Sequence, residues 1–126
     1  MSDDATVGLI RGLVENLKGA PKGWASLAVV LQFDAEKVNG VHGFAYSAEG
    51  VDFSVTASPY DLRSVVKEYT DTYYRPGAAL PAALLIQFDR ASGRYEVTFE
   101  DSDAARWKVT PANFDSIGEK LRPDFT

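Results

Sequence analysis

Residues 99–114 read FEDSDAARWKVTPANF, and this stretch indicates more about the fold than any other part of the chain. It leads from a strand with period-two alternation, through an acidic turn and the pair Arg106-Trp107, to Thr110-Pro111, which is typical of the start of a helix. Nothing in it matches the pattern of a nucleophile, a metal site or a phosphate-binding loop. We therefore interpret it as a rigid surface feature that contacts a partner.

The segments on either side of this stretch extend the same pattern. Upstream, residues 94–100 alternate in polarity, and a turn at residues 91–93 joins them to an apolar strand at residues 82–89. Downstream, Thr110-Pro111 predicts the start of a closing helix. Its inward-facing side chains are expected to be Phe114, Ile117 and Leu121.

The first half of the chain predicts a helix at residues 4–18 and strands at residues 24–33, 41–47 and 51–56, with Asn39-Gly40 as a turn. Ser58-Pro59 is typical of the start of a second helix. The inward residues of the first helix are expected to be Val7, Ile10, Val14 and Leu17, with Leu9 and Leu13 widening the stripe. Those of the second helix are expected to be Leu62, Val65, Val66, Tyr69 and Tyr73.

These elements predict the α+β class. Short hairpins favour antiparallel pairing, so we expect an antiparallel sheet of about five strands with three helices, in the order α-β-β-β-α-β-β-α. The chain of 126 residues is long enough for one core, and residues 1–126 are expected to form a single domain.

The net charge limits the choice of partner. The formal net charge is −5 and the sequence pI is near 4.8. Affinity for nucleic acid or an anionic membrane needs a basic surface and is not expected, whereas a basic protein partner is compatible with this charge.

There is no cysteine, which excludes disulfides and thiolate zinc sites. The acidic start lacks the layout of a secretory signal, and no apolar run reaches the roughly 20 residues of a membrane span. We expect a cytoplasmic protein.

The residues that usually carry chemistry do not form a recognisable catalytic or metal-binding pattern. His42 lies in a predicted strand, and the chain has no Gly-x-Ser-x-Gly elbow. A calcium loop that began at Asp101 would place Arg106 and Ala112 where a glycine and a bidentate acid are needed. We therefore expect no catalytic residue, no cofactor and no metal, and do not expect an enzyme.

Acidic residues cluster just before and within residues 99–114. Between residues 95 and 105 there are four acids and no base, and Arg106 and Trp107 follow, two residue types enriched at interface hot spots. The alternative is that Trp107 fills the core beneath the last helix while Arg106 pairs with Asp103 or Glu100. At the end of the second helix, Tyr74 and Arg75 are expected to be exposed. The candidate partner-binding residues are thus Glu100, Asp101, Asp103, Arg106, Trp107, Tyr74 and Arg75.

Residues 95–113, together with the later Leu121-Arg122-Pro123, resemble the YezG-like immunity proteins. The predicted element order is similar to that of the family as well. The resemblance implies a single YezG-like domain that acts as the cognate antitoxin of a secreted polymorphic toxin, many of which are nucleases. An acidic surface suits stoichiometric inhibition of such a basic enzyme, because opposite charges speed association.

A second hypothesis is a small-molecule or peptide-binding module. Its pocket would lie between the sheet and the second helix and would be lined by Tyr69, Tyr73 and Phe53. This hypothesis predicts a deep apolar cavity with a few convergent polar groups, whereas the immunity hypothesis predicts a shallow acidic surface.

Overall fold

The structure is a computed structural model that describes residues 2–34, 37–73, 80–103, 106–113 and 116–123. Its elements confirm the predicted class and order. They are α1 (Ser2–Asn16), β1 (Ser26–Asp34), β2 (Lys37–Tyr46), β3 (Asp52–Thr56), α2 (Pro59–Tyr73), β4 (Ala83–Asp89), β5 (Tyr95–Glu100) and α3 (Ile117–Leu121).

The five strands form one antiparallel sheet in the order β3-β2-β1-β4-β5. Strand β1 lies at the centre, where Val29 is paired with Gly43 of β2 on one side and with Ile86 of β4 on the other. The nearly continuous apolar run of β1 suits this place, because a central strand covered on both faces buries side chains of both orientations.

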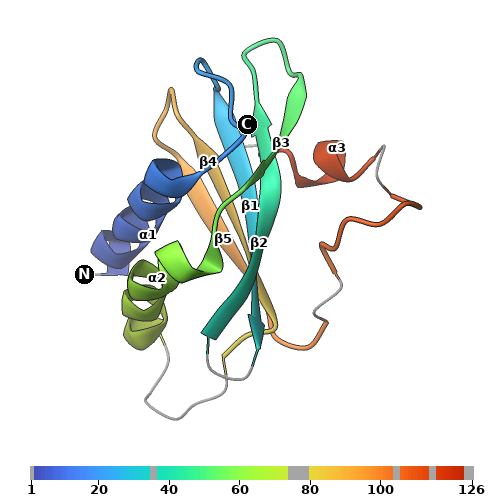
Figure 1. The fold of residues 1–126 in the computed structure, drawn as a ribbon. Helices are drawn as coiled ribbons and strands as arrows, with labels where there is room; N and C mark the ends of the chain where they lie inside the picture. The colour runs from blue at the N-terminus through green and yellow to red at the C-terminus, as the bar shows by residue number, and fades with distance from the viewer. Residues whose placement is uncertain (1, 35–36, 74–79, 104–105, 114–115, 124–126) are drawn as a thin grey trace.

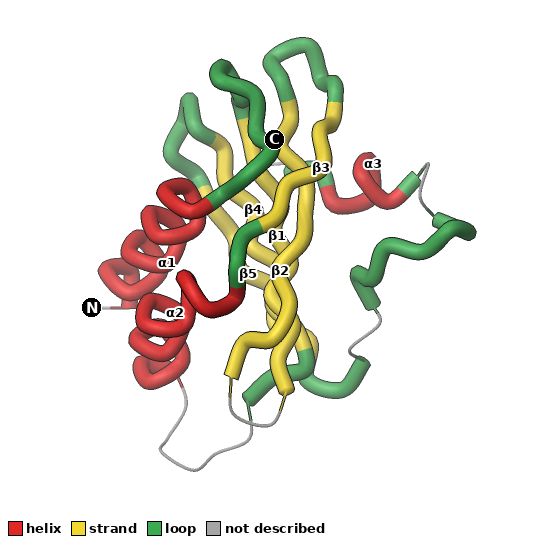
Figure 2. Tube along the Cα trace, in the orientation of Figure 1, coloured by secondary structure: helices red, strands yellow, loops and turns green. Residues whose placement is uncertain are grey.

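Three layers result (Figure 1). Helices α1 and α2 pack on one face of the sheet, and α3 with the segment after β5 packs on the other, as the coloured tube in Figure 2 also shows. Each face has its own core. Beneath the two long helices the core includes Leu9, Leu13, Leu62, Val66, Tyr69, Val29, Leu31 and Ile86. Beneath α3 it includes Ala28, Val30, Phe44, Tyr46, Leu85, Trp107, Ile117 and Leu121.

The buried face of α1 differs from the predicted stripe. Leu9, Ile10 and Leu13 are buried as expected, but Val7 is 42% exposed and Val14 is 37% exposed. The helix packs against α2 as well as against the sheet, and Leu9 and Leu13 belong to the core that includes Leu62 and Val66 of α2. The two valines are left on the side of α1 that faces away from α2.

The closing helix is shorter than predicted. It does not start at Thr110-Pro111, because residues 111–113 form a turn and α3 begins only at Ile117. In that turn the backbone N–H of Thr110 donates to Asn113 Oδ1 at 2.7 Å, and the backbone N–H of Asn113 donates to Thr110 Oγ1 at 3.3 Å. These side-chain contacts replace helical hydrogen bonds. Ile117 and Leu121 are buried as predicted, and Phe114 lies outside the described residues.

Asn39-Gly40 is not a turn but part of β2. Phe33 is paired with Val38, and Gln32 with Gly40, so Asn39 is the extra residue of a β-bulge. The prediction of a turn at Asn39-Gly40 was wrong, because the residue types that favour tight turns also favour the local kink of a β-bulge.

Strand β3 buries only one of its apolar side chains. Val55 is buried, but Phe53 is 39% exposed and the preceding Val51 is 54% exposed. The strand lies at one edge of the sheet, where the helices cover only part of its inner face.

Candidate partner-binding surface

The acidic turn, residues 100–103, is organised by one carboxylate at the end of β5. Glu100 Oε2 accepts hydrogen bonds from the backbone N–H groups of Ser102 and Asp103, both at 3.2 Å. Glu100 Oε1 accepts a hydrogen bond from Arg106 Nη1 at 3.0 Å. A single side chain thus accepts hydrogen bonds from two turn amides and pairs with a cation, and these contacts restrain the turn.

The same contacts set the charge state of Glu100. The backbone N–H groups of Asp103 and Ser102, followed by the Arg106 guanidinium, hold the pKa of Glu100 below its ordinary value of 4.5. Glu100 therefore stays ionised, but its negative charge interacts with the two turn amides and with Arg106.

Asp101 and Asp103 are the acids that the turn presents outward. Both are exposed, and the backbone carbonyl of Asp103 accepts a hydrogen bond from the Arg106 N–H at 3.2 Å. The predicted acidic cluster therefore exists as a local structure. Within it, Glu100 shapes the turn and the two aspartates form its outer surface.

Arg106 and Trp107 take the places that the structural alternative predicted. Trp107 is only 4% exposed and belongs to the core beneath α3, so its ring is not part of the exposed surface. The Arg106 guanidinium lies 4.8 Å from the centre of that ring and pairs with Glu100, and about half of its side chain remains exposed. Arg106 thus joins the acidic turn to the core. Tyr74 and Arg75 lie outside the described residues.

His42 contacts the segment that follows β5. Its Nε2 lies 3.0 Å from the backbone carbonyl oxygen of Trp107. Two other sheet side chains do the same: Tyr46 Oη donates to the carbonyl of Gly118 at 2.5 Å, and Gln87 Nε2 donates to that of Leu121 at 2.9 Å. The sequence did not reveal that His42, Tyr46 and Gln87 all contact backbone carbonyl groups of the segment after β5. They are scattered over β2 and β4 and come together only when the sheet forms.

Tyr46 is the most deeply placed member of this set. Burial raises the pKa of its hydroxyl, and the nearby Arg122 opposes that shift in part. The Arg122 guanidinium lies 4.5 Å from the centre of the Tyr46 ring, pairs with Glu119, and donates through Nη2 to the carbonyl of Gly50 at 2.6 Å. The tyrosine is therefore a neutral hydrogen-bond donor beneath α3.

The pocket predicted for the second hypothesis is not formed by the described residues. Tyr69 is buried and its ring stacks on Phe99 of β5 at 6.4 Å. Phe53 lies on β3, at the opposite edge of the sheet, and the side chain of Tyr73 is outside the described residues. The two aromatic side chains that can be placed are therefore too far apart to line one cavity.

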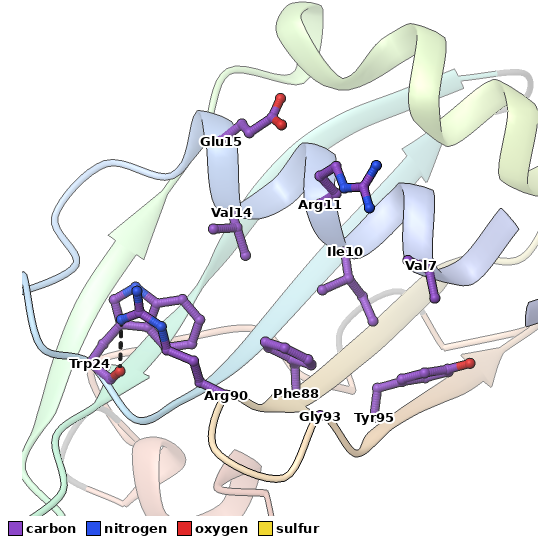
Figure 3. Close-up of a pocket in the computed structure, with 10 residues that line it drawn as sticks. All are labelled: Val7, Ile10, Arg11, Val14, Glu15, Trp24, Phe88, Arg90, Gly93 and Tyr95. Carbon is purple, nitrogen blue, oxygen red and sulfur yellow. Dashed lines mark hydrogen bonds between the residues drawn. The ribbon is translucent and has the colours of Figure 1, made fainter. Parts of the chain in front are cut away.

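A different hollow lies between α1 and the hairpin of β4 and β5 (Figure 3). Its volume is about 560 Å³, and we refer to it as the α1–hairpin hollow. Its apolar lining consists of Val7, Ile10, Val14, Trp24, Phe88 and Tyr95. The exposure of Val7 and Val14, which the predicted stripe of α1 had placed in the core, is what opens it.

Among the residues that the structure describes, no group of three or more histidine, cysteine, aspartate or glutamate side chains is arranged to hold a metal ion. No helix among them combines the length and the apolar composition needed to cross a bilayer.

No protein-family model, no curated protein and no solved structure matches this chain. The resemblance to the YezG-like immunity proteins therefore rests on the residues of the 95–123 stretch themselves.

Proposed function

We propose that this protein is an immunity protein, which binds a cognate secreted toxin and neutralises it by stoichiometric inhibition in the cytoplasm of the producing cell. The toxin that the charge suits best is a nuclease, because an enzyme that holds nucleic acid carries a basic surface for the phosphates. The motif at residues 95–113, the net charge of −5 and the shape of the acidic turn support this proposal.

The observation that carries the proposal is the way Glu100 prearranges Asp101 and Asp103. Both amides that Glu100 accepts belong to the turn, and Arg106 closes it from the other side. A loop that is already ordered loses little conformational entropy when a partner binds, so more of the contact energy appears as affinity. The hydrogen bonds of Glu100 support a preordered turn, which suits an inhibitory contact.

Electrostatics supplies the second part of the argument. The excess negative charge of the whole chain attracts a basic partner from a distance, and the exposed aspartates at the end of β5 give that attraction a local target. Steering of this kind raises the association rate more than the final affinity.

The proposal predicts that a neighbouring gene encodes a secreted protein with a toxin domain at its C-terminus, and it is tested with that domain. That domain is assayed for cleavage of DNA and RNA while this protein is titrated into it. We expect activity to fall linearly and to vanish at an equimolar ratio. Unchanged activity at a large molar excess would contradict neutralisation, and complete loss at a small fraction of one equivalent would indicate an enzyme that destroys the toxin.

A further inference from the structure

The α1–hairpin hollow has the size and lining of a small-ligand site. Its volume of about 560 Å³ falls within the roughly 300–1,000 Å³ that is usual for ligand pockets. In Figure 3, Val7, Ile10 and Val14 point from α1 toward Phe88 and Tyr95 of the hairpin. The walls of the hollow are therefore aliphatic on one side and aromatic on the other.

Arg90 gives this apolar hollow a fixed positive charge at one end. Its guanidinium lies 4.5 Å from the centre of the Trp24 ring, and its Nη1 donates to the Trp24 carbonyl at 3.2 Å (Figure 3). The ring contact and the hydrogen bond together hold the guanidinium in place. An arginine has five N–H donors, and no carboxylate pairs with Arg90 among the described residues, so donors remain for an anion.

Two other charged side chains lie at the rim of the hollow. They are Arg11 and Glu15, four residues apart on α1 and of opposite sign. Glu15 extends to the side of α1 away from the hairpin in Figure 3, so the charge at the hollow is positive, from Arg90 at one end and Arg11 at the rim.

We propose that the α1–hairpin hollow binds a small amphipathic carboxylate, with an aliphatic or aromatic body against α1 and the hairpin and the carboxylate on Arg90. The planar guanidinium matches the two oxygens of a carboxylate, and an apolar body removes Val7, Val14 and Phe88 from water. This site is separate from the acidic turn, so its occupation does not depend on the proposed toxin.

The direct test compares octanoate with octanol by isothermal titration calorimetry. The two probes share an aliphatic chain and differ in the charged group that Arg90 is expected to hold. We expect octanoate to bind about 10- to 100-fold more tightly, the usual range for a hydrogen-bonded charge. Nuclear magnetic resonance shifts on addition of octanoate should centre on the amides of Gly93 and Val14. Equal affinity for the two probes, or shifts elsewhere, would overturn the proposal.

Two variants and two matched controls test the contacts themselves. Arg90→Gln should reduce octanoate affinity to that of octanol, while Arg63→Gln should not, although Arg63 also lies over an aromatic ring, 5.5 Å from the centre of Tyr60. Val14→Glu, which places an anion at an exposed position in the hollow, should abolish octanoate binding. Val51→Glu makes the same change at an exposed valine beside β3 and should have no effect.

These variants also distinguish a bound carboxylate from a second copy of this chain in the hollow. If the wild-type protein dimerises through this face, sedimentation velocity will show a dimer that Val14→Glu dissociates. In that case the hollow is an interface between two copies and the carboxylate site is refuted. Octanoate binding that survives both Arg90→Gln and Val14→Glu also refutes it.

Discussion

Glu100 shows how one side chain can determine the shape of a surface feature. Its carboxylate accepts from two backbone amides and from Arg106, which in turn lies over the buried Trp107. The exposed turn is thereby tied to the core beneath α3. Asp101 and Asp103 owe their positions to this arrangement.

The lowered pKa of Glu100 predicts a pH dependence of stability. A carboxylate with a lower pKa in the folded state stabilises it above the unfolded value of 4.5, and that contribution is lost as the pH falls through the folded value. Glu100→Gln should therefore lower the melting temperature at pH 7, and the difference from wild type should shrink below pH 4.5. Glu96→Gln, at an exposed position of the same strand, should leave the melting temperature unchanged. A difference for Glu100→Gln that grows toward acid pH would contradict this explanation.

Gly43 is required because the backbone of β1 passes too close for any side chain. A Cβ at this position would lie 2.1 Å from the Ala28 carbonyl oxygen and 2.8 Å from Val29 Cα. Gly43→Ala should lower the free energy of unfolding by about 3 kcal/mol or more, as measured by urea denaturation. Gly8 of α1 is the control, since a Cβ there meets no atom within 4 Å and Gly8→Ala should stabilise the helix by about 0.5–1 kcal/mol. Equal effects at the two glycines would show that β1 and β2 are not this close.

At the scale of the elements, the short helix α3 depends on its contacts with the sheet. Five residues are too few for a helix to be stable alone, so burial of Ile117 and Leu121 and the bonds from Tyr46 and Gln87 must supply the stability. The C-terminal segment is a covering layer that β2 and β4 hold in place.

Truncation of Ile117 tests this dependence. Ile117→Ala should cost about 2–5 kcal/mol of unfolding free energy, because the side chain is 2% exposed and leaves a cavity. Lys120→Ala changes an exposed residue of the same helix and should stay within about 0.5 kcal/mol. Urea denaturation of both variants gives the comparison, and a small effect for Ile117→Ala would mean that α3 is not docked on the sheet.

The elements also show where local sequence patterns succeed and where they fail. The order of helices and strands was predicted correctly, because hydrophobic period and turn residues are local signals. Three features were not predicted correctly, because each depends on residues that are distant in the chain. They are the buried face of α1, the start of α3 and the bulge at Asn39. Gly12 illustrates this: a Cβ there would lie 2.8 Å from Val65 Cγ1, a helix contact that no local pattern reveals.

At the scale of the whole molecule, the two faces of the sheet separate the two proposed sites. The α1–hairpin hollow lies on the side of the long helices, whereas the acidic turn leads from β5 into the segment that covers the other side. The acids of the turn could be predicted from the sequence because they are contiguous. The hollow could not, because α1, Trp24 and the hairpin meet only in the folded chain.

The rate of association with the toxin domain, measured at low and at physiological salt, decides whether the acidic turn is the toxin-binding surface. Asp101→Lys combined with Asp103→Lys should slow association about tenfold at low salt and flatten its salt dependence, with the melting temperature nearly unchanged. Glu49→Lys combined with Glu68→Lys changes the net charge equally at exposed positions elsewhere and should slow it far less. Equal rates for the two double variants would contradict the assignment of the acidic turn as the toxin-binding surface.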